Sequence, residues 1–165
     1  MKVLIFSDVH GAQKRLLDIL KSHDDAEIII SLGDHELSSH FLKTHQIIAV
    51  KGNYPMDVGV GYTHEQMIGN KKVFFTHGHH YWIKSGFDRL LLAMTATGAQ
   101  VCFHGHTHQI GFTQFSGRTI INPGAVSFAR GKEPESYCVV EVKKDQWLIK
   151  WYDALKHTVL KTVSL

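Results

Sequence analysis

Short apolar runs alternate with helix-like stretches through the first hundred residues of the chain. Residues 3–7 and 28–32 are mainly apolar and are followed by polar or glycine residues, as expected of buried strands. Between them, leucine and isoleucine recur every three or four residues, which predicts a helix over residues 12–22. Further strands are expected at 46–50 and 100–103, and helices at 37–43 and 86–97. Strands that alternate with helices favour a parallel sheet with helices on its outer faces.

The rest of the pattern is richer in hairpins. Residues 62–68 and 71–76 flank the turn pair Gly69-Asn70 and predict two antiparallel strands. From residue 110 onward we expect strands at 111–115, 118–121, 136–142, 146–152 and 157–163, with turns at Asn122-Pro123-Gly124 and Lys143-Lys144-Asp145. Trp147, Ile149 and Trp151 alternate along one strand, which predicts a core face or else a subunit contact. The predicted fold class is α/β, with two packed sheets flanked by helices.

The composition is that of an ordinary globular protein. The chain has 165 residues, of which 44% are hydrophobic and 20% charged, and we expect one domain, residues 1–165, with a sizeable core. The net charge is +3 and no Lys/Arg cluster stands out, so no specific nucleic-acid partner is indicated. No segment approaches the roughly 20 apolar residues of a membrane span, and the opening apolar run is too short for a secretory signal. We therefore expect a soluble, cytoplasmic protein.

Side chains that can bind metal follow five of the predicted strands. In chain order they are Asp8 and His10, Asp34, Asn53, His77 and His79, then His106 and His108. Parallel strands bring their carboxyl ends to one edge of a sheet, so these side chains can converge there. Singly, the aspartates can cap helices and Asn53 fits a turn. His106 and His108 lie two residues apart and point the same way if the backbone is extended. Together these residues predict a metal site.

The ligand set indicates two ions rather than one. Leaving His79 aside, two carboxylates, one amide and four imidazoles are too many for a single tetrahedral zinc. They suit two divalent ions with mixed nitrogen and oxygen ligands and one bridging carboxylate. Cys102 and Cys138 lie in apolar strand-like runs, so we expect buried free thiols. Without a thiolate ligand, neither an iron–sulfur cluster nor a structural zinc is expected.

These motifs resemble the five blocks of the calcineurin-like metallophosphoesterases. The matching residues are Asp8-x-His10, Gly33-Asp34, Gly52-Asn53, His77-Gly78-His79 and Gly105-His106-Thr107-His108. The short chain and the Asn122-Pro123-Gly124 turn are similar to the small one-domain phosphodiesterase branch. That branch also includes the non-catalytic vacuolar-sorting subunit of the retromer. The resemblance implies the metallophosphoesterase fold, a four-layer α/β/β/α sandwich of two mixed sheets flanked by helices.

The resemblance also implies a ligand assignment. The first ion would be held by Asp8, His10, Asp34 and His108, and the second by Asp34, Asn53, His77 and His106. In this dinuclear metal centre Asp34 would bridge the two ions, and a bridging hydroxide would attack phosphorus in line with the leaving oxygen. Histidine and carboxylate accept several transition metals, so manganese is the first choice and nickel, iron, cobalt and zinc are the alternatives.

Two residues are candidates for catalysis and substrate binding. Asn53 would steady a phosphoryl oxygen as well as bind metal, and His79 would donate a hydrogen bond to the phosphate and serve as the general acid. Many family members carry a histidine after the Gly-Asn pair that protonates the leaving group, but here Tyr54-Pro55 follows and the nearest acid is Asp57. Tyrosine, with a pKa of about 10, is a poor acid at neutral pH. Esters with good leaving groups should therefore be favoured over alkyl monoesters.

The predicted function is a metal-dependent phosphodiesterase, a phosphoric ester hydrolase that acts on a small phosphodiester or nucleotide-like substrate. A phosphomonoesterase or nucleotide phosphatase on the same site is one alternative, and a non-catalytic protein-binding scaffold of the same fold is another. A homo-oligomer is compatible with the sequence. Near the motifs, we expect His35, Glu36, His80 and His104 on the surface, and Tyr54, Tyr81 and Trp82 either stacking on a substrate ring or packing.

Overall fold

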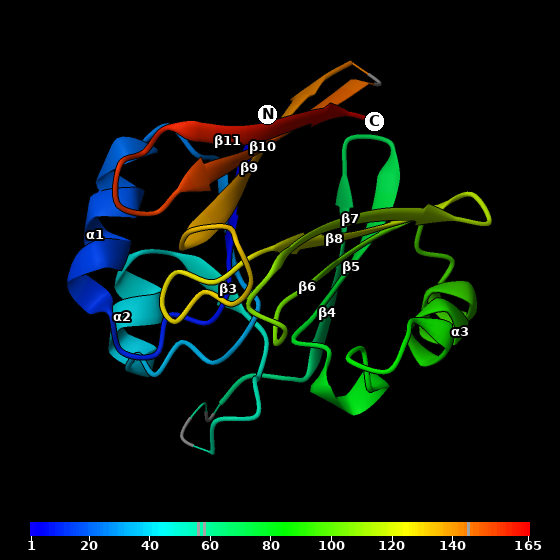
Figure 1. Cartoon of the computed structure of the whole chain (residues 1–165), viewed down its shortest axis with the longest axis horizontal. Coiled ribbons are helices and arrows are strands. Elements are labelled where there is room, and N and C mark those ends of the chain that lie inside the picture. The colour runs from blue at the N-terminus through cyan, green and yellow to red at the C-terminus, as the bar shows by residue number, and fades with distance from the viewer. Residues whose placement is uncertain (56, 58, 145) are drawn as a thin grey trace.

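Two mixed β-sheets pack face to face, and helices cover their outer faces (Figure 1). The structure is a computed structural model, and it describes residues 1–55, 57, 59–144 and 146–165. The Lys143-Lys144-Asp145 turn therefore lies partly outside the described residues. The expected α/β/β/α layering is confirmed.

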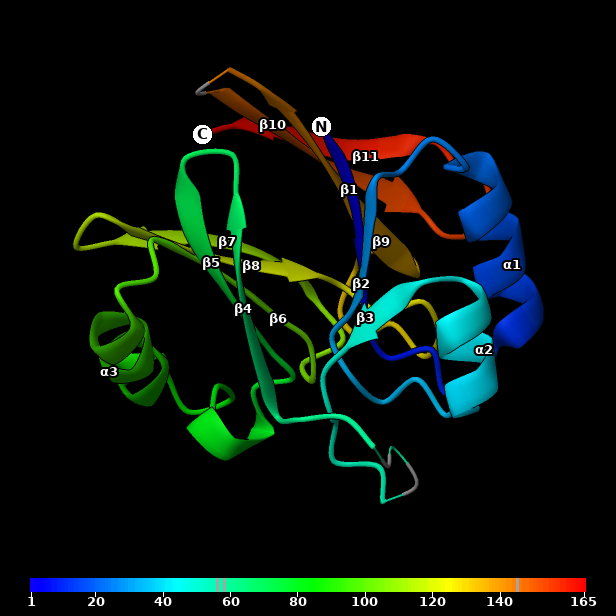
Figure 2. The same ribbon diagram turned by 180° about the vertical axis from the view of Figure 1, so that it is seen from behind.

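The first sheet joins the two ends of the chain, as the view from behind also shows (Figure 2). In spatial order its strands are β11 (Val159–Ser164), β10 (Gln146–Asp153), β9 (Ser136–Lys143), β1 (Lys2–Phe6), β2 (Ile28–Ser31) and β3 (Ile47–Ala49). The strands β1, β2 and β3 run parallel, as the alternation with helices predicts. Strand β9 pairs antiparallel with β1 and continues into the β9–β10 hairpin, a long-range pairing that the sequence pattern does not indicate.

The second sheet is built from the middle of the chain. In spatial order its strands are β4 (Thr63–Ile68), β5 (Lys71–Thr76), β6 (Val101–His104), β8 (Arg118–Pro123) and β7 (Ile110–Phe115). The three central strands are parallel, and the two edge strands are antiparallel partners in hairpins. The hairpin expected around Gly69-Asn70 is the one between β4 and β5.

The helices lie where the apolar periodicity predicts them, within two residues at each end. Helices α1 (Gln13–Ser22) and α2 (Ser39–Thr44) cover the first sheet, and α3 (Asp88–Thr97) covers the second. Helix α2 begins later than expected because Ser38 caps it, its side chain accepting a hydrogen bond from Phe41 N at 3.1 Å. A short 3₁₀ helix, η1 (His79–Tyr81), was not expected. In the part of the chain that the structure describes, no helix is long and apolar enough to span a membrane.

The main core lies between the two sheets. It contains Trp147, Ile149 and Trp151, which are 0–1% exposed, so the predicted core face of this strand is confirmed. Two further clusters fill the space between the first sheet and its helices and between the second sheet and α3. Cys102 and Cys138 are buried free thiols, as expected.

Glycines allow the loops at the strand ends to approach each other closely, both between the two sheets and within the first sheet. Gly105 follows β6, and a Cβ atom there would collide with Oγ of Ser7 and crowd the carboxylate of Asp8, which follow β1. In the same way, a Cβ at Gly52 would collide with Asp34. At both positions the absence of a side chain is therefore required by contact distance.

We predict that Gly105→Ala lowers the free energy of unfolding by about 1–3 kcal/mol, because the added methyl group must displace Ser7 or Asp8 from a packed position. The matched control is Gly61→Ala, whose Cβ would make an ordinary 3.5 Å contact with Thr63 O. Urea unfolding followed by circular dichroism measures both variants. Equal stability of the two would contradict the close approach described here.

Candidate metal centre

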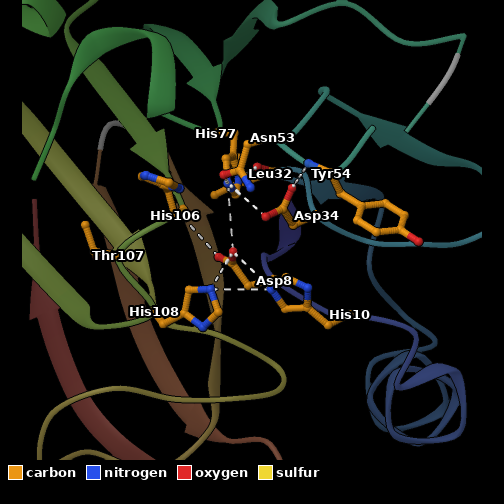
Figure 3. A network of polar contacts seen from close by, with 12 residues as sticks. Asp8, His10, Leu32, Asp34, Asn53, Tyr54, His77, His106, Thr107 and His108 are labelled. Carbon is orange, nitrogen blue, oxygen red and sulfur yellow. Dashed lines mark hydrogen bonds and ion pairs between the residues drawn. The ribbon is translucent and has the colours of Figure 1, made fainter. Parts of the chain in front are cut away.

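The residues predicted to bind metal converge where the carboxyl ends of strands from both sheets meet (Figure 3). The first sheet supplies residues that follow β1, β2 and β3, and the second supplies residues that follow β5 and β6. In that order they are Asp8, His10, Asp34, Asn53, His77, His106 and His108. The convergence of parallel strand ends therefore brings together residues that are up to 100 positions apart.

Asp8 lies at the centre of this group. Its side chain is fully buried, and Oδ2 accepts a hydrogen bond from the backbone N–H of His106 at 3.1 Å. Its other oxygen, Oδ1, has no hydrogen-bond partner of good geometry among the described residues. That oxygen faces three imidazole Nε2 atoms, at 3.1 Å for His108, 3.8 Å for His10 and 3.9 Å for His77. A buried carboxylate oxygen in this setting requires positive charge beside it.

Each of these three imidazoles is held through its Nδ1 atom. The acceptors are Glu36 Oε1 for His10 (2.9 Å), Leu32 O for His77 (2.8 Å) and Phe128 O for His108 (2.7 Å). When Nδ1–H donates to such an acceptor, Nε2 carries the free lone pair, and this is the orientation of metal-binding histidines in proteins. The residues present therefore fit a metal ion, by both their donor atoms and their supporting bonds.

Two groups of three ligand atoms are compact enough to hold an ion. They are Asp8, His10 and His108, and Asp8, Asp34 and His77, with the atoms of each group within 4.8 Å of one another. Asp34 Oδ2 lies 3.4 Å from His77 Nε2, and Asp34 Oδ1 accepts a hydrogen bond from Tyr54 N at 2.8 Å. Asp8 thus belongs to both groups, whereas the family resemblance assigns the bridge to Asp34.

The remaining predicted residues border these groups. Asn53 Oδ1 lies 3.2 Å from His77 Nε2, and the rings of His106 and His79 lie 5.1 and 5.4 Å from the His77 ring, centroid to centroid. Tyr54 contributes its backbone N–H to Asp34, and its phenol ring points away from the cluster (Figure 3). The residue that replaces the usual histidine is therefore not aimed at the site.

Most of the converging residues have an unusual backbone. The φ angles are 54° at Asp8, 46° at His10, 47° at Asp34, 67° at His106 and 59° at His108. This left-handed region is uncommon outside glycine, and residues held in it cluster at functional sites. The expectation that His106 and His108 point the same way along an extended strand is wrong. Both residues follow the end of β6, and their left-handed backbone conformations orient the two side chains.

The charges of the cluster depend on one another. Burial raises the pKa of Asp8, but the close contact with His108 and the charge of His77 outweigh it and hold this pKa below its usual value. Burial lowers the pKa of His77, but the hydrogen bond with Asp34 and the nearby carboxylates outweigh it and raise this pKa. The pKa of His108 is raised in the same manner by Asp8. Protons on these imidazoles therefore compete with metal ions for the same Nε2 atoms.

His79 and His106 behave differently. Burial and then the charge of His77 lower the pKa of each to about 4. Both rings are therefore neutral at pH 7. Nδ1 of His79 is also buried without a hydrogen-bond partner among the described residues. A neutral imidazole with an unused polar atom beside the cluster can exchange a hydrogen bond with a bound ligand.

His35, which is expected on the surface, and Asp57 are both buried supports of the site. His35 is 1% exposed, and its Nδ1 lies 3.4 Å from Oδ1 of Asp57. The Asp57 carboxylate also accepts hydrogen bonds from the backbone N–H groups of Glu36 and Gly52, at 3.3 and 3.4 Å. Asp57 therefore braces the loops after β2 and β3 and is not placed to protonate a leaving group.

The other neighbours divide between support and surface. His104 is 3% exposed and Glu36 is half-buried, so the expected surface positions are wrong for both, whereas His80 is exposed as expected. Trp82 is 61% exposed, with the Arg89 guanidinium 3.9 Å from its ring centroid, so it is not a packed core residue. The roles of Glu36 and of the Phe128 carbonyl are not predictable from the sequence, because neither residue belongs to a recognisable motif.

A family model confirms the resemblance. The calcineurin-like phosphoesterase superfamily domain matches residues 1–145. The chain belongs to this superfamily. It is 32% identical over 156 residues to YsnB of Bacillus subtilis strain 168, which is named a probable metallophosphoesterase. The matched region covers 93% of this chain and 91% of YsnB. It is 26% identical over 169 residues to the phosphodiesterase YfcE of Escherichia coli K12, over 86% of this chain and 88% of YfcE.

Solved structures share the fold. A predicted phosphoesterase from Streptococcus pneumoniae TIGR4 superposes with a TM-score of 0.88 at 24% identity, over 99% of this chain and 97% of that one. Wild-type Vps29 of Entamoeba histolytica, in a complex with zinc, superposes with a TM-score of 0.81 at 22% identity, over 100% and 98% of the two chains. The expected metallophosphoesterase fold is thereby confirmed.

We predict that Glu36→Ala weakens metal binding by about 10- to 100-fold, because His10 loses the carboxylate that fixes its ring. The measurement is a calorimetric titration of the metal-stripped protein with Mn²⁺. Glu36→Gln should recover part of the affinity, since its amide oxygen can still accept from His10 Nδ1. The exposed Glu133, replaced by Ala, is the control. Unchanged affinity in Glu36→Ala would show that His10 needs no support from this residue.

Proposed function

We propose that the protein is a metal-dependent phosphodiesterase with a dinuclear centre of divalent transition-metal ions. The observation that carries the proposal is the buried Oδ1 of Asp8, which faces three imidazole Nε2 atoms whose rings are all held through Nδ1. Membership of the phosphoesterase superfamily and the likeness to YfcE support the reaction class.

Our proposed ligand assignment follows the family pattern. The first ion would bind Asp8, His10, Asp34 and His108, and the second would bind Asp34, Asn53, His77 and His106. Manganese remains our first choice of metal, with nickel, iron, cobalt and zinc as alternatives. When bound, two such ions would lower the pKa of a shared water so that hydroxide is available at neutral pH for in-line attack on phosphorus.

The surroundings of the cluster suit an anionic substrate. Burial, His77 and then the charge of Lys84 lower the pKa of His106, and the charge of Arg130 opposes the rise in the pKa of His108. The same two cations line a pocket of about 450 Å³ beside the loop that carries these histidines. Positive charge on this side would attract a phosphodiester anion toward the centre.

His79 and Asn53 would contact the phosphoryl group. With a pKa of about 4, His79 is neutral at pH 7 and can donate an N–H to a phosphoryl oxygen, but it holds too little of its acid form to be an effective general acid. Since Tyr54 turns its phenol away and Asp57 is engaged with backbone amides, none of the residues weighed as a general acid is placed to protonate the leaving group. The site would therefore favour diesters whose leaving group departs as a stable anion.

Two alternatives use the same fold. A phosphomonoesterase or nucleotide phosphatase would need a proton donor for its leaving group. A protein-binding scaffold is suggested by Vps29, which shares the fold with this chain. The supporting bonds to His10, His77 and His108 favour catalysis, because a scaffold does not require oriented imidazoles. A small phosphodiester or nucleotide-like substrate, a cytoplasmic location and a homo-oligomer remain predictions.

We predict that chelator-stripped protein regains hydrolysis of bis-p-nitrophenyl phosphate when Mn²⁺ or another transition metal is added singly. Turnover of this aryl diester should exceed that of an alkyl monoester such as glycerol 2-phosphate. Asp34→Ala should abolish the activity, while Asp18→Ala, at an exposed position on α1, should retain it. Faster turnover of the monoester would favour the phosphatase. Two bound ions with no hydrolysis would favour the scaffold.

We predict that His79→Ala slows the hydrolysis of methyl p-nitrophenyl phosphate and of methyl phenyl phosphate by the same factor, about tenfold or more. The substitution removes a hydrogen bond to a charged group in both reactions. Steady-state rates on the two diesters give the comparison, and His40→Ala, at an exposed position on α2, is the control. A larger effect on the phenyl ester, the poorer leaving group, would restore the general-acid role for His79.

A further inference from the structure

Phe128 combines two features that are unfavourable for a phenylalanine. Its side chain is 68% exposed, and its φ angle is 58°, in the left-handed region that bulky residues rarely adopt. It lies in the loop that follows β8. Backbone strain of this kind persists only where the surrounding structure imposes it, and it is concentrated at functional sites.

The loop around Phe128 is fixed to the metal-binding motifs. Besides the bond from His108 Nδ1 to the Phe128 carbonyl, four hydrogen bonds hold it. They run from Val126 N to Ser7 O (3.0 Å), Ser127 N to Asp8 O (3.1 Å), Ser127 Oγ to Val9 O (3.1 Å) and Arg130 N to His108 O (2.9 Å). The backbone on both sides of Phe128 is therefore held in place, and the ring is presented from a rigid support.

The ring itself stands at the edge of the metal centre. Its centroid lies 5.7 Å from that of His10, with the two planes at 63°, an edge-to-face contact. The strained backbone is explained by the carbonyl that orients His108, but this bond does not require a large side chain. The exposed ring is left without a structural reason, and it stands beside the place where a substrate phosphate would bind.

We propose that Phe128 determines specificity by stacking on an aromatic substituent, a nucleobase or an aryl group, of the phosphodiester substrate. This inference rests on the proposed function. An edge-to-face contact with His10 leaves open surface on the Phe128 ring, and stacking adds affinity for flat aromatic groups beyond that from the area they bury. Because the loop is already rigid, little conformational freedom is lost on binding.

The test compares phenylphosphonate with methylphosphonate, which share the anionic head group and differ in the ring. Calorimetry on the Mn²⁺-loaded protein gives both dissociation constants, without relying on turnover. We expect phenylphosphonate to bind about three- to tenfold more tightly than methylphosphonate. Phe128→Tyr should keep this ratio, and Phe128→Ala should reduce it to about one. Because each variant is judged by a ratio, any effect passed through His108 to the metal cancels.

Two further variants sharpen the test. Phe128→Gly also lacks the ring but adopts the left-handed backbone without strain, so it should melt at a higher temperature than Phe128→Ala and show the same loss of preference. Phe115→Ala removes another exposed ring (60%) at the far end of β7 and should retain the preference. An unchanged ratio in both ringless variants, with bis-p-nitrophenyl phosphate still hydrolysed, would overturn this inference alone. Failure of both phosphonates to bind, together with absent hydrolysis, would overturn the proposed function as well.

Discussion

The centre of the structure depends on one electrostatic requirement, the neutralisation of the fully buried Asp8 carboxylate. A carboxylate removed from water needs positive charge and hydrogen bonds to remain ionised. One oxygen is satisfied by the backbone of His106, and the other is surrounded by imidazoles. The loops after β1, β5 and β6 are thus arranged around a single negative charge.

The local backbone reflects this requirement. Five of the seven predicted ligands have left-handed φ angles, and glycines at 52 and 105 allow loops to approach within contact distance. These conformations are unfavourable singly, and they persist because hydrogen bonds from neighbouring loops hold them. Asp57 and the loop after β8 provide many of those bonds, so residues outside the motifs determine where the motif side chains point.

The local pattern of apolar residues predicts the helices and strands well, but it predicts the pairing of distant strands poorly. Apolar periodicity located α1 and most strands, and the polar residues at strand ends located the cluster, because both signals are local or follow from parallel topology. The pairing of β9 with β1 leaves no trace in either segment, since both read simply as buried strands. The supports of the site were equally hidden: Glu36 was expected on the surface, Asp57 was weighed only as the nearest acid to the motif, and the Phe128 carbonyl carries no side-chain signal at all.

The predicted ligands come from both layers of the sandwich: Asp8, His10, Asp34 and Asn53 follow strands of the first sheet, and His77, His106 and His108 follow strands of the second. Ions held between them would act as a crosslink at one open end of the core. Ligand binding to the folded state alone adds about 2.7 kcal/mol of stability at 100 times the dissociation constant. Metal supply in the cell would then set how firmly the two sheets stay closed, and scarcity would first loosen this end.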